Sequence, residues 1–443
     1  MPGGAKPQLA GWGGLSVPGR ELRSERLEEV ARGLPLTRGL GRSYGDSALP
    51  PPGVTAVAGS VRADRILALD PARARLRAEA GLSLRDLAWT LLPRGLFPPV
   101  VPGTQFVTLG GMVAADVHGK NHHVAGTIGR HVTGLRLLTA AGEIVDCSRE
   151  RSPDLFRATI GGMGLTGHLL ELELALDRIP SPWILQETRR VAHLDETLAA
   201  LAESARDWPF TVCWLDALAS GRALGRGVLI RGRWAEPGEA PGTPPRPLRG
   251  PAVPFRLPGF ALNDLSVRLF NAVYRASFPA RLRRSVVHPQ KFFWPLDAVR
   301  HWNRIYGARG FTQFQCVLPE SERPGAVRRF LAEAARRGGS SFLCVIKDCG
   351  AEGEGLLSFP RPGVSVALDL PMRRDTRALV EALADVVLAE GGRIYLAKDA
   401  FVRADQFRAM EPRLAAFARA RDRWDPERRL RSAQSVRLLG DPA

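Results

Sequence analysis

Residues 38–46 of the sequence are RGLGRSYGD, and two further glycine-rich stretches follow, PGTQFVTLGG at residues 102–111 and GGMGLTG at residues 161–167. Glycine allows consecutive backbone N–H groups to converge on an anion and allows the chain to approach a ligand closely. One such loop is commonly a plain turn. Three of them, with Ser and Thr donors among them, predict a binding site for a large phosphorylated cofactor.

The spacing excludes two common nucleotide-binding motifs. The first stretch has the pattern GxGxxxG, whereas a Rossmann loop has GxGxxG and must open a helix. Here residues 46–52 are DSALPPP, and the three prolines prevent a helix. The sequence also contains no GxxxxGK[ST], which excludes a P-loop.

Length and composition indicate an ordinary globular protein. The chain has 443 residues, of which 45% are hydrophobic and 24% charged, and this length suits two or three domains. No window approaches 18 uncharged apolar residues, so a membrane-spanning helix is excluded, and the N-terminus lacks the apolar core of a signal peptide. The five cysteines form no CxxC pair. We therefore expect a reducing, cytoplasmic compartment, no disulfide framework and no metal.

The net charge of +17 comes almost entirely from arginine, because only five of the 62 basic residues are lysines. Where arginine is the usual cation, a retained lysine suggests a site that needs a compact ammonium group with an adjustable pKa. Lys120, Lys291, Lys347 and Lys398 are the candidates outside the N-terminus. No signature of a nucleic-acid reader is present. A basic, non-enzymatic binding protein remains as an alternative on charge alone.

Hydrophobic periodicity predicts two regions that differ in their pattern of strands and helices. Up to residue 180 the pattern favours short strands and helices, with strands at 66–69, 74–80 and 170–174, a helix capped by Ser83, a hairpin over 132–147 and a helix starting at Ser152. Beyond it we expect strands at 209–217, 226–234, 311–318, 341–347, 364–370 and 393–397, helices at 325–338, 375–390 and 403–421, and a loop at 236–259. The second region therefore suggests an α+β domain with an antiparallel sheet.

Residues 38–46, 102–111, 116–122 and 154–167 together resemble the flavin-binding domain of the vanillyl-alcohol-oxidase-type FAD flavoproteins. The likeness narrows with HGKNHH at 118–123, QFQ at 313–315, LSFP at 357–360 and YLAKD at 395–399. These motifs are similar to those of the branch that oxidises polyprenylphosphoryl-β-D-ribose. The resemblance extends over most of the chain and is weakest at residues 1–20 and 236–290.

The resemblance implies an α+β, two-domain PCMH-type fold, with an FAD-binding domain at residues 1–182, an antiparallel-sheet substrate cap at 183–392, and a C-terminal segment at 393–443 that returns to the first domain. It also implies oxidation of a sugar hydroxyl to a ketone by hydride transfer to flavin N5, at the 2′-hydroxyl of polyprenylphosphoryl-β-D-ribose, in epimerisation of an arabinan precursor. A separate NAD(P)H-dependent keto-sugar reductase would complete that epimerisation.

The family's functional positions carry over residue by residue. The implied cofactor-binding residues are Arg38, Gly39, Gly41, Arg42, Ser43, Tyr44, Gly45, Gly103, Thr104, Thr108, Gly110, Gly111, His118, Gly162, Gly164, Gly167, Tyr395 and Lys398. The implied substrate-binding residues are Lys120, Trp214, Gln313, Gln315 and Lys347. Lys398, His118 and Tyr44 are the catalytic candidates, and Lys398 is expected on a strand beside the flavin, where it stabilises developing negative charge.

Two departures from the family pattern carry expectations of their own. Arg42 stands where many relatives attach the flavin covalently to a histidine, so we expect dissociable FAD. Ala367 stands where the best-known bacterial members have a cysteine, so inhibitors that trap that thiol should not bind covalently.

Two alternatives remain open at the cap. Because residues 236–290 match poorly, a soluble FAD-dependent sugar, alditol or aldonolactone oxidase is an alternative substrate class. Residues 268–284 mix apolar and arginine side chains, and this pattern fits either an ordinary amphipathic helix or a peripheral contact with an anionic lipid surface.

Overall fold

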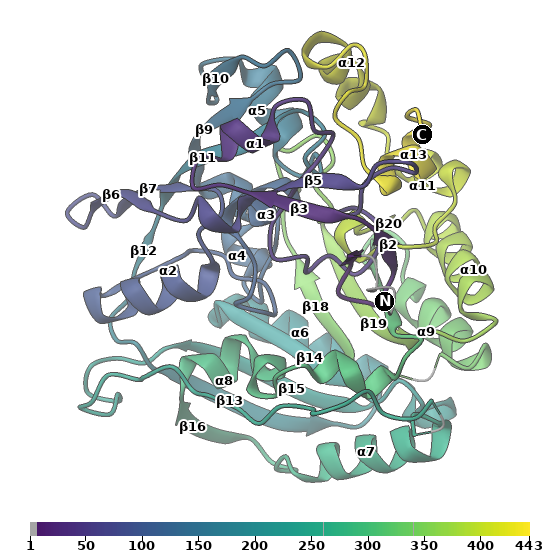
Figure 1. Cartoon of the computed structure of the whole chain (residues 1–443). Coiled ribbons are helices and arrows are strands. Elements are labelled where there is room, and N and C mark those ends of the chain that lie inside the picture. Colours follow the sequence, from purple (N-terminus) through teal and green to yellow (C-terminus); the bar gives the residue numbers. More distant parts are fainter. Residues whose placement is uncertain (1–6, 260, 340) are drawn as a thin grey trace.

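The largest element of the computed structural model, which describes residues 7–259, 261–339 and 341–443, is an eight-stranded antiparallel sheet (Figure 1). Its order is β16-β13-β15-β14-β18-β19-β17-β20. The strands are β13 (Ile184–Val191), β14 (Phe210–Leu215), β15 (Gly227–Trp234), β16 (Arg283–Val287), β17 (Phe311–Leu318), β18 (Cys344–Cys349), β19 (Gly363–Pro371) and β20 (Arg393–Ile394).

Three helices cover one face of this sheet, namely α6 (Leu194–Asp207), α9 (Ala326–Arg336) and α10 (Thr376–Ala389). Because side chains alternate along a strand, Phe314 and Cys316 of β17 and Val366 and Leu368 of β19 enter that core. The polar residues between them therefore point to the opposite face. β17 is buried along its whole length, which shows that the second face is also covered.

The first part of the chain builds two smaller sheets of three or more strands, besides the two-stranded sheets β1 (Gln8–Ala10) with β2 (Ser16–Pro18) and β8 (Leu96–Phe97) with β12 (Asp177–Arg178). A five-stranded antiparallel sheet has the order β10-β9-β11-β7-β6, and a three-stranded parallel sheet has the order β3-β5-β4. The strands are β3 (Arg20–Arg23), β4 (Thr37–Arg38), β5 (Ala56–Gly59), β6 (Ile66–Asp70), β7 (Arg75–Glu79), β9 (Val132–Leu138), β10 (Ile144–Cys147) and β11 (His168–Ala175). Helices α2 (Leu84–Leu91), α3 (Leu109–Ala114) and α5 (Pro153–Thr159) pack with the larger of these sheets in one apolar core.

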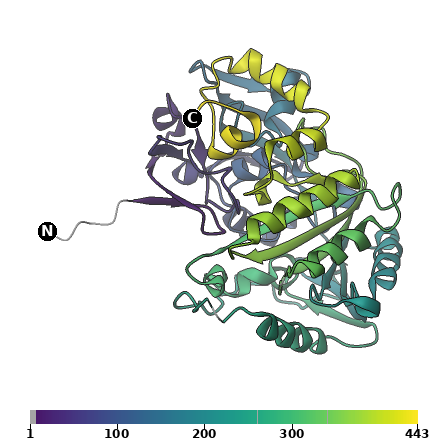
Figure 2. The ribbon, with the colours of Figure 1, turned by 90° about the vertical axis from the view of Figure 1, so that its right-hand side faces the viewer.

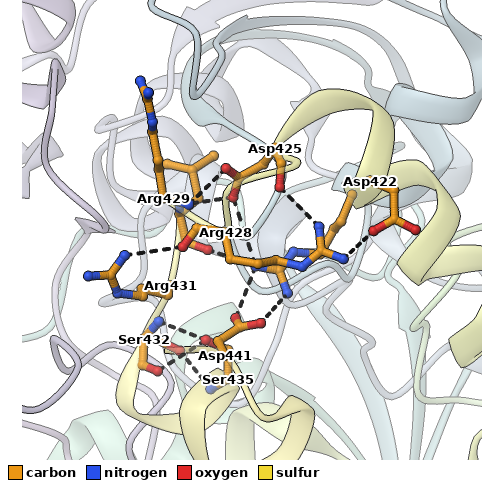
Figure 3. Close-up of polar contacts among 10 residues, drawn as sticks. Asp422, Asp425, Arg428, Arg429, Arg431, Ser432, Ser435 and Asp441 are labelled. Carbon is orange, nitrogen blue, oxygen red and sulfur yellow. Dashed lines mark hydrogen bonds and ion pairs between the residues drawn. The ribbon is translucent and has the colours of Figure 1, made fainter. Parts of the chain in front are cut away.

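The C-terminal helices α11 (Ala404–Met410), α12 (Leu414–Trp424) and α13 (Ala433–Leu439) lie beside this first part (Figure 2). Trp424 Nε1 donates to Asp154 Oδ2 at 3.0 Å. Beyond α12 the chain turns back through a polar cluster, in which Asp425 accepts the backbone N–H groups of Arg429 and Leu430 (Figure 3). The buried Arg421 forms an ion pair with Asp441 at 2.9 Å. This cluster fixes the path of the final helix.

Most of the expected elements are present. The 132–147 hairpin is β9 and β10, the 170–174 strand lies within β11, and Ser83 caps α2 by accepting the Asp86 N–H at 3.1 Å. The strand at 393–397 is wrong beyond Ile394, because Leu396–Lys398 is a 3-10 turn. The helix at 403–421 is wrong as a single element. Pro412 lacks an N–H and separates α11 from α12.

Two further expectations need correction. Ser152 precedes α5 as expected, but its side chain makes no capping hydrogen bond. Residues 268–284 are not one helix, because α7 (Asp264–Ala276) ends before Pro279 and the chain continues into β16. Within the described ranges no helix is both long enough and apolar enough to cross a bilayer. The domain limits stay a prediction, and residues 1–6 of the first domain lie outside the described residues.

Candidate active site

The first two glycine loops are in direct contact. A Cβ atom on Gly39 would lie 2.3 Å from Thr108 Oγ1, so only glycine permits this approach. Thr108 caps α3, since its hydroxyl oxygen accepts the N–H of Gly111 at 3.2 Å. Gly41 has φ +63°, the left-handed region in which glycine carries no steric cost. The two predicted loops therefore pack against each other.

The first loop also packs on the segment that carries Lys398. The N–H of Tyr44 donates to the carbonyl of Ala397 at 3.0 Å, and a Cβ on Gly45 would lie 1.7 Å from the carbonyl oxygen of Asp399. Lys398 Nζ is 3.8 Å from the centre of the Tyr44 ring. This cation–π contact joins two of the three catalytic candidates.

Arg437 of α13 links the first glycine loop to the segment that carries Lys398. Its guanidinium donates to both carboxylate oxygens of Asp46 at 2.8 Å and to Asp399 Oδ2 at 2.7 Å. Asp46 ends the first glycine loop and Asp399 follows Lys398 directly, and both carboxylates are buried. These two carboxylates raise the pKa of Arg437. The C-terminal helix thus connects the loop to the lysine segment.

The second face of the large sheet presents a row of polar side chains. Gln313 lies opposite Asp369 and Gln315 opposite Ala367 on β17 and β19, and Lys347 of β18 lies opposite Ser365. Gln315 Nε2 donates to Ser365 Oγ at 3.0 Å. The register therefore brings three of the predicted substrate residues to one surface.

Asp369, which is buried, and Lys398, which is half-buried, carry opposite charges that act on each other. The Asp369 carboxylate accepts hydrogen bonds from Gln313 Nε2 and from the Tyr306 hydroxyl, the latter at 3.1 Å. Burial raises the pKa of Asp369 to about 7, and burial lowers the pKa of Lys398 to about 7. Each group opposes the shift of the other by its charge. The Asp369 carboxylate is therefore protonated more readily, and the Lys398 ammonium group deprotonated more readily, than the same groups in water.

His118 is held as a neutral ring. Gln315 Nε2 donates to His118 Nε2 at 3.1 Å, which places the ring proton on Nδ1. The pKa of His118 lies well below its usual range because of burial, reinforced by Lys347, His122 and Lys398. Its buried Nδ1 has no hydrogen-bond partner among the described residues.

Lys120 and Lys347 add two further cations that have no ion-pair partner in the part of the chain that the structure describes. Lys120 Nζ donates to the carbonyl of Phe293 at 3.0 Å, and Lys347 Nζ donates to that of Gly119 at 3.2 Å. Burial lowers the pKa of Lys120 to about 7 and that of Lys347 to about 8, and Lys347 repels Lys120 further. The three lysines and His118 form a cluster that an anion would stabilise.

The two predicted aromatic residues lie at the border of this region. Tyr395 stacks on Phe359 with ring centres 4.8 Å apart, and its hydroxyl donates to the Ala115 carbonyl at 2.9 Å. The Trp214 indole donates to the Phe342 carbonyl and meets Tyr274 edge-on. Tyr395 is 5.4 Å from the His118 ring, so it belongs to the same cluster.

Several predicted cofactor residues have other partners. The Arg38 guanidinium binds Glu21 and the carbonyls of Ala10 and Ala48, and Thr104 Oγ1 donates to Asp297 at 2.8 Å. Close neighbours within the chain also account for glycine at three positions, where a Cβ would meet Ala80, Ala158 or Leu137, namely Gly110, Gly162 and Gly167. The role of these five residues in binding a cofactor stays a prediction.

Two residues of the site, Asp369 and Arg437, are absent from the sequence prediction. Asp369 had a usable signal, because the alternation in residues 364–370 places Ser365 and Asp369 on the face opposite the apolar residues. No sequence pattern distinguishes Arg437 from the many other arginines, and nothing in the sequence indicates that it pairs with Asp46 and Asp399.

The chemistry of the site fits a dinucleotide such as FAD. A Cβ on Gly103 or Gly164 would meet nothing within 4 Å, so these turns leave open space beside backbone N–H groups. Arg42 lies over the Trp12 ring at 3.9 Å, and its buried Nε has no partner among the described residues. Unpaired donors and open backbone are what a pyrophosphate requires.

Comparison with known proteins agrees with this fit. Residues 30–148 match the model of the FAD binding domain. The decaprenylphosphoryl-β-D-ribose oxidase of Mycolicibacterium smegmatis is 36% identical over 424 residues, which cover 93% of this chain and 90% of the relative. An uncharacterized protein of Streptomyces coelicolor is 33% identical, over 78% of this chain and 96% of its own length. The L-gulonolactone oxidase of Bos taurus is 32% identical over only 30% of each chain. The chain therefore belongs to the decaprenylphosphoryl-β-D-ribose oxidase family, and it is an FAD-dependent oxidoreductase that acts on a sugar CH–OH group.

Proposed function

We propose that the substrate is a polyprenylphosphoryl-β-D-ribose and that its 2′-hydroxyl is oxidised to a ketone. The carrying observation is the pair of Lys120 and Lys347, whose ammonium groups have lowered pKa values and no ion-pair partner among the described residues. Lys398 differs, because the negative charge of Asp369 acts on it. A sugar phosphate supplies the missing negative charge, whereas an alditol or a lactone does not. The near full-length match to the mycobacterial relative supports the same substrate class.

The three catalytic candidates differ in how well they can accept a proton. A base with a pKa near neutral is needed within reach of the hydroxyl. The pKa of Tyr44 is raised well above its usual value by burial, so its hydroxyl stays protonated. His118 Nε2 already accepts from Gln315. Lys398 Nζ makes no hydrogen bond to a described residue and has a pKa of about 7. We assign the base to Lys398.

Bound FAD would supply the hydride acceptor of this reaction. The glycine loops with Gly39, Gly103 and Gly164 would hold it, and Tyr395 would lie beside it. Once Lys398 has taken the hydroxyl proton, its new ammonium group stabilises negative charge that develops nearby. The ketone product still needs reduction, and a separate NAD(P)H-dependent reductase is the partner that this chemistry requires.

The phosphate role of the lysine cluster is tested by Lys347→Met and Lys120→Met. Each change removes a charged hydrogen bond of about 1.5–3 kcal/mol, so the dissociation constant of a short-chain polyprenylphosphoryl-ribose should rise about 10- to 100-fold. Affinity should also fall as pH rises through 7–8 in the unmodified protein, because both ammonium groups lose their protons there. Anaerobic titration of the flavin absorbance measures both effects.

The exposed Lys291 provides a matched control, and Lys291→Met should bind the same substrate unchanged. A simple alditol should reduce the flavin poorly in every variant. If an alditol reduces the flavin as fast as the phosphosugar, or if Lys347→Met leaves phosphosugar affinity intact, the sugar-phosphate assignment fails and the soluble alditol or lactone oxidase remains.

The FAD should leave the protein on denaturation. Arg42 occupies the expected linkage position, and all five cysteines are free and buried with raised pKa values, so no reactive thiolate replaces the histidine. Acid precipitation followed by absorbance of the supernatant should recover the flavin quantitatively. A fluorescent protein band after denaturing electrophoresis would contradict this expectation.

A further inference from the structure

Helix α7 carries an apolar stripe on its outer face. Leu265, Leu269 and Val273 follow one another at four-residue spacing, and 77%, 65% and 62% of these side chains are exposed. The inner face is anchored, because Val267 and Asn271 are buried and Asn271 Nδ2 donates to Asp216 Oδ1 at 2.8 Å. The helix is thus anchored to the cap with its apolar stripe exposed, whereas a surface helix in water normally exposes its polar face.

Other exposed apolar side chains lie in the same part of the sequence. Among the described residues, seven of the thirteen large hydrophobic side chains that are exposed fall between residues 248 and 282: Leu248, Phe255, Leu265, Leu269, Phe270, Val273 and Leu282. Figures 1 and 2 both place α7 at the outer end of the molecule, far from α12. Four of these seven, Leu265, Leu269, Phe270 and Val273, lie on α7 itself, so this helix carries a continuous exposed apolar surface of the kind that marks an interaction site.

The charge of this region identifies the partner. Between residues 264 and 284 the sequence has five arginines and one acidic residue, Asp264. The exposed Arg268, Arg281 and Arg283 have no ion-pair partner among the described residues. Two copies of this surface would bring arginines together, but an anionic bilayer takes apolar side chains and arginines side by side. We propose that α7 and the adjoining residues 281–284 dock the protein on an anionic lipid surface.

A row of aromatic rings leads from this surface to the active site. Phe270 contacts Phe342 at 5.5 Å, and Phe342 contacts Tyr306 at 5.3 Å. Phe311 continues the row, 4.1 Å from Tyr306 and 5.4 Å from Tyr44, above which Lys398 lies. If the substrate is a polyprenyl phosphosugar, as proposed above, this packed apolar core lies between the docking surface that would face its lipid chain and the site that would hold its ribose.

The test is sedimentation of the FAD-loaded protein with vesicles of phosphatidylglycerol and phosphatidylcholine. The unmodified protein should bind mixed vesicles, bind pure phosphatidylcholine at least 10-fold more weakly, and dissociate as salt increases. The triple variant Leu265→Asn/Leu269→Asn/Val273→Asn should lose at least 10-fold in vesicle affinity, and Arg268→Gln/Arg281→Gln/Arg283→Gln should lose the preference for anionic lipid. Ile66→Asn/Leu67→Asn, an exposed apolar pair on β6, is the matched control and should bind normally.

Three results would overturn the proposal: no binding to phosphatidylglycerol vesicles, equal binding by the α7 variant, or a stable dimer in solution that the α7 variant dissociates. The substrate is tested separately, because vesicle binding needs none. The α7 variant should oxidise a water-soluble short-chain phosphosugar at the normal rate and be slowed only on a long-chain substrate in vesicles. Failure of the unmodified protein on the short-chain substrate contradicts the proposed function and leaves the vesicle result standing.

Discussion

Lys398→Met is expected to lower the limiting rate of flavin reduction by substrate by about 10²- to 10³-fold, the range found when one preorganised stabilising group is removed. The fold and the flavin content should persist, because Lys398 Nζ makes a ring contact with Tyr44 but no hydrogen bond to a described residue. Anaerobic stopped-flow absorbance at saturating substrate measures the rate. Circular dichroism and the flavin-to-protein ratio check that the variant is intact.

The pH dependence and a second variant separate the two roles of this lysine. With a pKa of about 7, neutral Lys398 becomes abundant as pH rises, so the limiting rate in the unmodified protein should increase through pH 7 and then level off. Lys398→Arg retains a positive charge but does not release its proton, so it should remain slow and lose this pH dependence. A fast Lys398→Arg variant would mean that charge alone suffices, and an undiminished Lys398→Met variant would remove Lys398 from the mechanism.

Alternation along strands made much of the cap predictable. The expected strand at 311–318 puts Gln313 and Gln315, two residues apart, on one face, and the pairing of β17 with β19 places both on the face that also carries Lys347. The glycine loops were equally informative, since the Thr108 side chain approaches Gly39 closely and the Asp399 backbone approaches Gly45 closely, which leaves no room for a Cβ at either position. These features depend on the local pattern of residue types along the chain, which can be read directly from the sequence.

Long-range pairing was not predictable in the same way. The resemblance placed Lys398 on a strand, but Leu396–Lys398 is a 3-10 turn, and this turn packs against a distant loop through the hydrogen bond from the Tyr44 N–H to the Ala397 carbonyl. The net charge of +17 also suggested a basic, non-enzymatic binding protein, and this alternative is wrong. Arginines form ion pairs with many buried or half-buried carboxylates, such as Glu187 and Asp441, and membership of an enzyme family excludes the non-enzymatic binding protein.

The second large effect is expected for Arg437→Met. This change leaves the buried carboxylates of Asp46 and Asp399 without their cation, and breaking a buried pair in this way costs about 3–5 kcal/mol of unfolding free energy. The midpoint of urea denaturation should fall accordingly. Arg429→Met is the matched control, because Arg429 and its partner Glu427 are both exposed and their ion pair contributes at most about 1 kcal/mol.

Arg437 should also affect the reaction in a way that general destabilisation does not explain. Asp399 adjoins Lys398, and Asp46 ends the loop that places Tyr44 beneath the lysine, so a loosened contact displaces the base from its site. Below the denaturation range, Arg437→Met should retain less FAD and, when saturated with added FAD, should reduce it about 10-fold more slowly at saturating substrate, with little change in substrate affinity. Arg437→Lys keeps one charge but cannot reach both carboxylates in the forked geometry, and it should recover stability only in part. If FAD-saturated Arg437→Met reacts at the normal rate, the C-terminal helix stabilises the fold but does not position Lys398.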